Sequence, residues 1–212
     1  IAAALAAAKL DVSIAHLEAG LRSFNRSMPE EHNRVLTDHA SDLLLSPTDA
    51  SMTNLANEGL ANRSVLVGDV MADICLDVAE HVKESPPTDA DKPTEPFILA
   101  TLHRPYNTDS PKRLRRVIAA LASLPLPVVL PAHPRLVHLA AINGIKLDGG
   151  SIRVTAPLSY HNLIYLASNA RAIVTDSGGL QKEAFLLGVP CTTIRTETEW
   201  IETLNDEWNV LT

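Results

Sequence analysis

The chain has 212 residues, 46% of them hydrophobic and 20% charged, which suits one large or two small folded domains and excludes disordered and fibrous proteins. Its formal net charge of −7 disfavours general nucleic-acid binding, so an anionic ligand has to be held by local groups. No apolar run approaches the roughly 20 residues that a bilayer requires. Cys75 and Cys191 have neither a disulfide-framework nor a metal-site spacing. We therefore expect a cytoplasmic protein that binds neither membranes nor nucleic acids.

The opening alanine-rich run predicts a buried helix, and because no capping residue precedes Ile1, we expect upstream sequence to be absent. Short β-rich runs then alternate with helical patterns. Continuous apolar runs of this kind are typical of parallel strands that are buried on both faces. Strands are predicted at residues 12–16, 43–45, 64–67, 97–102, 127–130, 152–154, 172–174 and 191–194.

Helix start signals lie between these runs, at Pro29, Thr48, Ser110 and Ser159. The repeated alternation predicts an α/β protein with doubly wound parallel sheets. The proline-rich segment 83–96 has little apolar content and predicts an interdomain linker. We therefore assign residues 1–92 to the remainder of an N-terminal Rossmann-like domain plus the linker, and residues 93–212 to a C-terminal Rossmann-like domain. The first domain has too few strands for a complete sheet.

The segment from Ile173 to Gly188 predicts a strand that turns through two glycines into a helix ended by a glycine. Ser177, Gly178 and Gly179 would present backbone N–H groups and a helix N-terminus at the carboxyl end of a parallel strand, where phosphate binds. Glu183, one turn later on the same face, could accept hydrogen bonds from ribose hydroxyls. An ordinary tight turn is the alternative. Ser177 does not lie in a nucleophile elbow, and the dinucleotide and P-loop fingerprints do not occur.

Two groups of polar residues stand near the N-terminus. His16, Glu18 and Arg22 follow a predicted strand, so their loop would face a cleft; a surface loop with a salt bridge is the alternative. Glu30 and Glu31 open a helix, where acids also complement the helix dipole. The dipole explanation is preferred for Glu31 and is left open for Glu30.

His103 and Arg104 directly follow a strand, which places a titratable imidazole beside a permanent cation. This arrangement suits proton exchange with a substrate; a capping or anion-binding histidine is the alternative. His133 is a weaker case of the same kind. The other histidines lie in helical patterns, and no pair has metal-ligand spacing, so no metal site is expected.

Five motifs follow one another along the chain: residues 16–22 (His-Leu-Glu-Ala-Gly-Leu-Arg), 28–34 (Met-Pro-Glu-Glu-His-Asn-Arg), 67–71 (Val-Gly-Asp-Val-Met), 102–104 (Leu-His-Arg) and 175–184 (Thr-Asp-Ser-Gly-Gly-Leu-Gln-Lys-Glu-Ala). In order and spacing they resemble the non-hydrolysing UDP-N-acetylglucosamine 2-epimerase family. The resemblance implies a GT-B-like fold of two Rossmann-like domains with the nucleotide sugar between them. It also implies a fragment, because family members carry a Gly-Asp-Thr motif ahead of the first helix and further helices after the last residue.

The resemblance implies inversion at C2 of a UDP-2-acetamido sugar, from UDP-N-acetylglucosamine to UDP-N-acetylmannosamine, by elimination of UDP and its re-addition to a glycal. This chemistry requires an acid, a base and stabilisation of the departing UDP, with no metal or cofactor. By motif position, the implied catalytic residues are Glu18, Glu30 and His103. The implied UDP ligands are Ser177, Gly178, Gly179, Glu183 and Arg195.

Arg104 and His133 match positions that contact an effector UDP-sugar in some bacterial members. Tyr106 stands where the family often has an acid, and the Arg-Ser-Phe-Asn-Arg-Ser-Met-Pro run also occurs in relatives that act on modified sugars such as UDP-2,3-diacetamido-glucuronate, so the exact sugar stays open. A GT-B glycosyltransferase and a UDP-binding remnant without activity are the alternative functions. We expect this fragment to be weakly active or inactive alone. We also expect a homodimer, because self-association would cover the apolar surface of an incomplete domain.

Overall fold

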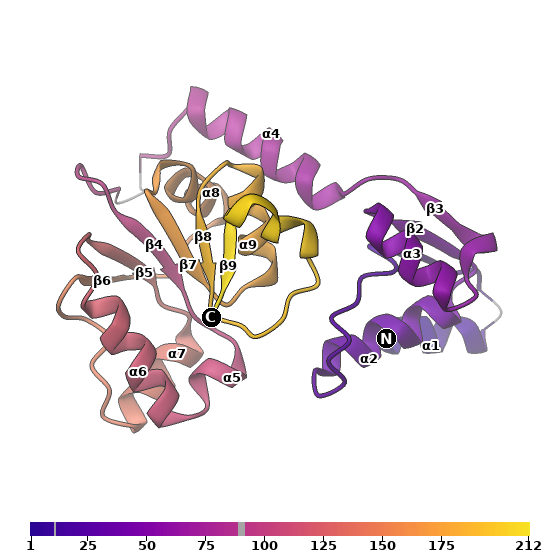
Figure 1. Ribbon diagram of the computed structural model, residues 1–212, viewed down its shortest axis with the longest axis horizontal. Coiled ribbons are helices and arrows are strands. Elements are labelled where there is room, and N and C mark those ends of the chain that lie inside the picture. Colours follow the sequence, from indigo (N-terminus) through magenta and orange to yellow (C-terminus); the bar gives the residue numbers. More distant parts are fainter. Residues whose placement is uncertain (11, 89–91) are drawn as a thin grey trace. The chain divides into compact units, whose positions relative to one another are not determined.

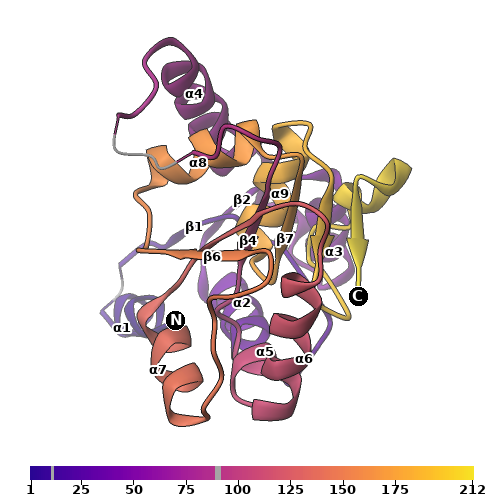
Figure 2. The same ribbon diagram turned by 90° about the vertical axis from the view of Figure 1, so that its left-hand side faces the viewer.

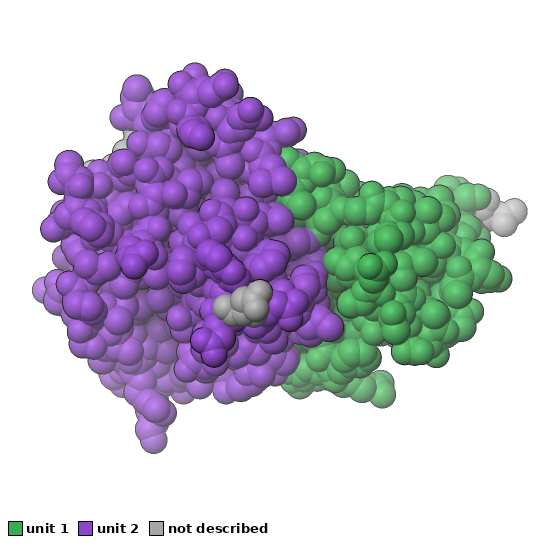
Figure 3. Space-filling view, turned by 45° about the horizontal axis from the view of Figure 1, so that its top comes forward, with its two compact units in different colours: residues 1–73 green, residues 74–212 purple. Residues whose placement is uncertain are grey.

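The computed structural model describes residues 1–10, 12–88 and 92–212. The chain forms two compact units, Ile1–Asp73 and Ile74–Thr212, which are coloured separately in Figure 3. Among the described residues, no helix is long and apolar enough to cross a membrane.

The first unit contains a parallel sheet in the order β1-β2-β3. Helix α3 packs on this sheet, because Leu55 of the helix and Leu44 of the central strand share a small core with Ala19 and Leu60. The elements are α1 (Ala2–Lys9), β1 (Ala15–Leu17), α2 (Pro29–Ala40), β2 (Leu43–Ser46), α3 (Asp49–Asn57), the short 3₁₀ helix η1 (Ala61–Arg63) and β3 (Ser64–Leu66).

Two predictions for this unit need correction. Helix α1 forms, but only Ala4 in it is buried, so the prediction of a buried helix is wrong. The first strand begins at Ala15 rather than at residue 12, because pairing with β2 starts at the Ala15–Leu43 register.

The second unit is built on a parallel sheet in the order β6-β5-β4-β7-β8-β9 (Figure 1). The elements are α4 (Val70–Glu84), which begins in the first unit, β4 (Ile98–Thr101), α5 (Pro105–Thr108), α6 (Pro111–Ala122), β5 (Val128–Pro131), α7 (Pro134–Ile142), β6 (Ile152–Thr155), α8 (Tyr160–Asn169), β7 (Ala172–Thr175), α9 (Gly178–Leu186), β8 (Cys191–Thr193), the 3₁₀ helix η2 (Ile201–Glu207) and β9 (Asn209–Leu211).

Helices cover both faces of this sheet (Figures 1 and 2). Successive residues of β4 point to opposite faces: Ile98 packs in the core under α6 and α7, whereas Leu99 packs in the core under α8 and α9. This alternation explains why the strand is a continuous apolar run. The α/β class with doubly wound parallel sheets is confirmed.

The strand order places the topological switch point between β4 and β7, since the chain runs outward from β4 in one direction and from β7 in the other. In open α/β sheets, ligands bind outside the carboxyl ends of the strands at such a point. This is where the predicted His103 and Ser177 motifs begin.

The predicted helix starts at Pro29, Thr48, Ser110 and Ser159 are all confirmed. Pro29 opens α2, and the other three residues cap α3, α6 and α8 by accepting a backbone N–H in the first turn. Gly188 follows α9 with a φ of +66°, the left-handed conformation that ends helices at a glycine.

Helix α4 packs on the second unit, where Cys75 and Val82 contact Ile164 of α8. The second compact unit therefore begins at Ile74, whereas the domain boundary between residues 92 and 93 stays a prediction. Of the predicted linker, residues 89–91 lie outside the described residues.

Candidate functional site

The carboxyl edge of the second sheet collects most of the predicted site residues. His103 and Arg104 follow β4, His133 follows β5, Ser177 follows β7 and Arg195 follows β8. Because all of these strands run parallel, their ends meet at one edge of the sheet. The hydroxyls of Thr101 and Thr175, 2.6 Å apart, join the ends of the two central strands at the switch point.

Asp176 is the centre of this edge, and its carboxylate is fully buried. It accepts hydrogen bonds from the backbone N–H of His103 (3.0 Å) and of Arg104 (3.0 Å), and from the amide Nδ2 of Asn107 (3.1 Å). Asn107 Nδ2 also donates to the carbonyl of Ile194, at the end of β8. Asp176 therefore holds the loop after β4 against its own loop after β7, and Asn107 joins both to the loop after β8.

The imidazole of His103 lies with Nδ1 3.2 Å from Asp176 Oδ1, and its side chain is 45% exposed. Burial lowers the pKa of His103, the charge of Asp176 raises it, and Arg104 and His133 lower it further, with a net lowering. A neutral ring that keeps its proton on Nδ1, the nitrogen nearer to Asp176, leaves Nε2 free to accept a proton. His103 is thus suited to proton transfer near neutral pH.

The turn from Ser177 to Gly179 begins α9. Ser177 caps the helix, because its Oγ accepts the N–H of Leu180 at 3.3 Å, while its own N–H donates to Thr175 Oγ1 at 3.0 Å. The hydroxyl proton of Ser177 can still be donated to a ligand. The helix N-terminus at the switch point has the backbone geometry of an anion site.

Arg195 lies against this turn. It is 6% exposed, and its Nη2 pairs with Glu199 Oε2 at 2.9 Å. Its Nη1 is buried and has no hydrogen-bond partner among the described residues. A Cβ on Gly178 would lie 3.3 Å from this Nη1 and 2.7 Å from Glu199 Oε1. Glycine is therefore required for close approach, and an unsatisfied guanidinium donor faces the turn.

Glu183 is 4% exposed, and its Oε1 accepts a hydrogen bond from the hydroxyl of Tyr160 at 2.9 Å. Burial raises the pKa of Glu183, and the bond from Tyr160 opposes that shift. The Cys75 thiol belongs to the same cluster: burial and the charge of Glu183 raise its pKa to about 11. The predicted ribose acceptor is thus a desolvated carboxyl that is oriented by a tyrosine.

Two further predicted residues lie near His103. His133 caps α7 by accepting the N–H of Arg135 at Nδ1 (3.2 Å). Tyr106 is 59% exposed, and its ring stacks on the guanidinium of Arg113 at 4.1 Å. No cluster of three or more His, Cys, Asp or Glu side chains that could hold a metal is found in the described part of the chain.

The acids of the first unit differ in environment. Glu18 follows β1 and has a φ of +64°, a left-handed conformation that costs a non-glycine residue roughly 1 kcal/mol. Glu30 is exposed at the start of α2. Glu31 is 4% exposed and accepts the N–H groups of Ser23 and Phe24, both at 2.9 Å. Glu31 therefore holds the preceding loop, which goes beyond the dipole role that we preferred.

Three site residues were missed: Asp176, Glu199 and Tyr160. Asp176 stands inside the quoted motif, so its position after a buried strand was a usable signal. Glu199 follows Arg195 by four residues, a weaker signal because that segment is not helical. Nothing in the sequence connects Tyr160 with Glu183.

The chain matches a known protein family over its whole length. The family described as UDP-N-acetylglucosamine 2-epimerase matches residues 1–212. The chain belongs to the UDP-N-acetylglucosamine 2-epimerase family.

Several members of this family are similar over the whole chain. A "UDP-2,3-diacetamido-2,3-dideoxy-D-glucuronate 2-epimerase" of Pseudomonas aeruginosa is 48% identical over 100% of this chain and 60% of its own length. A "UDP-N-acetylglucosamine 2-epimerase homolog" of Methanococcus maripaludis is 44% identical over 100% of this chain and 61% of its own length.

Among solved structures, the Methanocaldococcus jannaschii UDP-GlcNAc 2-epimerase in complex with UDP-GlcNAc and UDP has a TM-score of 0.88 and 35% identity, covering 100% of this chain and 61% of that one. The chain thus spans about three fifths of the length of these relatives. The GT-B-like assignment and the family resemblance are confirmed.

Proposed function

We propose that the protein is an isomerase that inverts C2 of a UDP-2-acetamido sugar, converting UDP-N-acetylglucosamine to UDP-N-acetylmannosamine. The observation that carries this proposal is the start of α9 at the switch point of the second unit, where the buried Nη1 of Arg195, without a partner among the described residues, faces the Gly178 turn. Membership of the family supplies the reaction class. Relatives are longer than this chain, so the activity is proposed for a chain extended at both ends to their length.

The second unit would bind UDP. Ser177, Gly178 and Gly179 offer a hydroxyl, backbone N–H groups and a helix N-terminus to the diphosphate. Arg195 adds a guanidinium whose unsatisfied donor an anion would complete. Glu183 would accept hydrogen bonds from the ribose hydroxyls. Stabilising the diphosphate makes UDP a better leaving group, which lowers the barrier of an elimination.

The reaction requires two proton transfers at C2. A base removes the C2 proton, the C1–O bond breaks with its electrons leaving on UDP, and a C1=C2 glycal forms. UDP oxygen then re-adds to C1 while an acid protonates C2 on the opposite face. We propose that Glu18, Glu30 and His103 supply these protonation steps; a neutral His103 held by Asp176 suits such a role.

The exact sugar remains a choice between two substrates. The Pseudomonas aeruginosa relative is named for a UDP-2,3-diacetamido-2,3-dideoxy-D-glucuronate, and the archaeal relatives are named for UDP-N-acetylglucosamine. Tyr106 stacked on Arg113 is exposed beside His103 and replaces the acid common in the family. Arg104 and His133 are proposed as contacts for an effector UDP-sugar.

The decisive experiment follows the C2 proton of a UDP-sugar in heavy water by proton NMR, with this chain and with the extended chain. We expect deuterium at C2 and appearance of the manno epimer with the extended chain, for one of the two sugars. Glu18→Gln and Glu30→Gln should lower the rate of exchange by about 10²- to 10⁴-fold, to a residual rate that is still measurable, while UDP binding by calorimetry persists. Arg195→Met should abolish UDP binding, and Glu80→Gln, on the exposed face of α4, serves as a control that keeps both.

Three outcomes would contradict parts of this proposal. UDP binding without C2 exchange of either sugar favours a glycosyltransferase. If Arg195→Met and a Gly178 variant both still bind UDP, the nucleotide site lies elsewhere. Full turnover by residues 1–212 alone refutes the proposal that the chain depends on further sequence.

We also propose a homodimer in the cytoplasm. The cytoplasmic location is supported by Cys75 and Cys191, which are both buried and form no disulfide, as expected in a reducing compartment. Sedimentation velocity of the extended chain tests the dimer, and a single species with the mass of one chain at micromolar concentration would refute it.

A further inference from the structure

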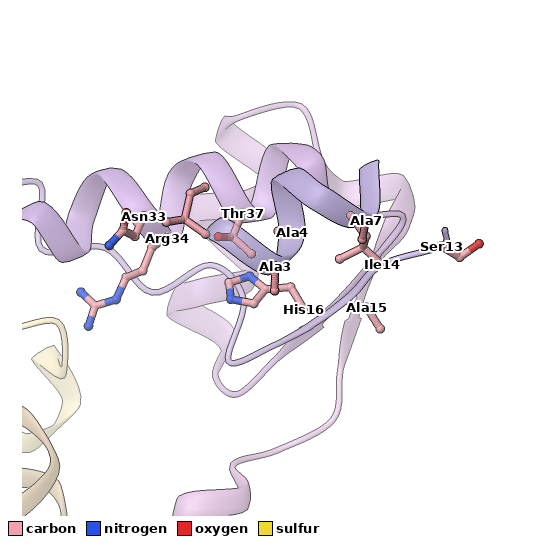
Figure 4. Close-up of a pocket in the computed structure, with 11 residues that line it drawn as sticks. Ala3, Ala4, Ala7, Ser13, Ile14, Ala15, His16, Asn33, Arg34 and Thr37 are labelled. Atoms are coloured by element: carbon pink, nitrogen blue, oxygen red, sulfur yellow. The ribbon is translucent and has the colours of Figure 1, made fainter. Parts of the chain in front are cut away.

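In the first unit, a buried carboxylate holds the loop that carries Glu18. Asp38 lies on α2 and is fully buried. Its Oδ1 is 2.5 Å from Nδ1 of His16, and its Oδ2 accepts the backbone N–H of Gly20 at 3.1 Å. His16 also lines a pocket of about 550 Å³, together with Asn33, Arg34 and Thr37 of α2. Figure 4 shows the side chains of these residues. The two carboxylate oxygens of Asp38 therefore contact the chain on both sides of Glu18, at His16 and at Gly20.

The backbone between these two contacts is strained. Glu18 is the residue between these two contacts that adopts the left-handed conformation, with a φ of +64°. Gly20 also has a positive φ, of +83°, and a Cβ there would lie 2.4 Å from the carbonyl oxygen of Ser51. An unfavourable conformation persists only when its surroundings impose it. Asp38 on one side and α3 on the other supply that constraint.

The charge and hydrogen bonds of Arg22 keep Asp38 ionised. Arg22, also buried, donates to Asp38 Oδ2 from Nη2 at 2.8 Å and to Glu58 through Nε and Nη2, both at 2.8 Å. Burial alone would raise the pKa of Asp38, but its bonds to His16 and Arg22 lower it overall. Asp38 is therefore charged in the folded chain, and the substitution Asp38→Asn removes this charge while keeping the shape of the side chain.

Asp38 also links the positions of two proposed acids, Glu18 and Glu30, through helix α2. It lies on the same helix, α2, whose first turn contains Glu30. Two helical turns separate the residues, so a rigid element joins the Glu30 end to the loop of Glu18. The carboxylate of Asp38 therefore fixes how Glu18 lies relative to Glu30 within this unit.

We propose that Asp38 is a positioning residue for proton transfer at C2: it fixes the loop of residues 16–22 so that Glu18 meets the sugar in one orientation. The inference rests on the proposed function, because it assigns Glu18 to that proton transfer. A displacement of about 1 Å at a reacting group costs on the order of 100-fold in rate. The effect should therefore appear in kcat and leave UDP binding by the second unit unchanged.

The test compares Asp38→Asn with Asp42→Asn in the extended chain. Asp42 is an exposed control of the same kind, because its Oδ2 also accepts a backbone N–H, that of Ile14 at 2.8 Å, just before β1 and away from the loop of Glu18. We expect Asp38→Asn to lower kcat for C2 exchange by about 10- to 100-fold with KM unchanged. Amide exchange at Gly20 should speed up about tenfold, since its acceptor loses its charge. Asp42→Asn should change neither.

Additional variants separate positioning from general damage. In a Glu18→Gln background, Asp38→Asn should lower kcat no further, because the group it positions is gone. If Asp38→Asn does not fold, as judged by circular dichroism, Asp38→Glu keeps the charge and displaces it by one methylene, and the same loss of kcat is expected.

The inference is overturned if Asp38→Asn keeps kcat within about twofold of the wild type, or lowers the Glu18→Gln rate by the same factor as it lowers the wild-type rate. A wild-type chain that exchanges no C2 proton contradicts the proposed function instead, and removes the role assigned to Glu18. The Gly20 amide then still reports whether Asp38 fixes the loop: unchanged exchange in Asp38→Asn refutes that step independently of activity.

Discussion

Adding one methyl group at either of two adjacent glycines should have opposite effects on the stability of the second unit. In Gly178→Ala, the new Cβ would lie 2.7 Å from Glu199 Oε1 and 3.3 Å from Arg195 Nη1. In Gly179→Ala, it would meet only Ser177 Oγ, at an ordinary 3.8 Å. Both glycines are in the first turn of α9, and neither has a positive φ, so backbone strain does not distinguish the two variants.

The magnitude follows from what the methyl group displaces. Glu199 and Arg195 are 7% and 6% exposed and pair at 2.9 Å, so moving the carboxylate disturbs a buried ion pair. Overpacking costs about 1–3 kcal/mol, and replacing glycine by alanine in a helix returns up to about 1 kcal/mol. Gly178→Ala should therefore lose about 1–2 kcal/mol, and Gly179→Ala should gain up to about 1 kcal/mol.

Tryptophan fluorescence isolates the second unit in this assay, because the two tryptophans of the chain, Trp200 and Trp208, both lie there. Urea titrations should place the midpoints of the two variants on opposite sides of the wild type. The two variants should differ by about 1–3 kcal/mol, which at about 2–4 °C per kcal/mol separates their melting temperatures by about 2–12 °C. Equal stability of the two variants would refute the close approach of Arg195 and Glu199 to Gly178.

Three other results are expected. Arg22→Met should destabilise the first unit by about 3–5 kcal/mol by far-UV circular dichroism in urea, since it strands the buried Asp38; a loss under 1 kcal/mol would contradict this. Burial raises the pKa of Glu183 in the folded chain, so folding favours its protonated form. The stability that this preference contributes is fully present below the ordinary carboxyl pKa of 4.5, and it is lost as pH rises through the folded pKa. Glu183→Gln should therefore stabilise the chain at pH 7 and leave it unchanged at pH 4; equal effects at both pH values would contradict the shift. Burial raises the pKa of Cys75 and of Cys191 to about 11, so neither should react with a thiol reagent at pH 8 until the chain unfolds; labelling of the native chain would contradict their burial.

The fold was largely predictable because its signals are local. Each predicted strand overlaps an observed one, since apolar runs of this length have to be buried on both faces. Strand β9 was missed because Asn209, Val210 and Leu211 show no periodicity; the strand exists only through its pairing with β8. The exposure of α1 was missed for a related reason: an alanine-rich helix has no polar face from which burial can be read.

The candidate site was predictable only in part. The Ser177 turn and the His103 loop have local signatures, a strand end followed by glycines or by a basic pair. Their connection depends on Asp176, which bonds to the N–H of His103 across 73 residues of sequence. The sequence around an aspartate in a polar run is the same whether its side chain is exposed or buried. Its hydrogen-bond partners therefore cannot be predicted without the fold.

The two units share one structural principle. Asp176 in the second unit and Asp38 in the first are both fully buried, and each accepts hydrogen bonds from backbone N–H groups and contacts Nδ1 of a histidine. A buried carboxylate is costly unless every oxygen is satisfied, so the loops that satisfy it lose their alternative conformations. In both units, the fixed loop carries the residues to which we assign the chemistry: His103 in one and Glu18 in the other. Preorganisation, and not the stability of either unit, is therefore the more consistent reason for placing these two charges in the interior.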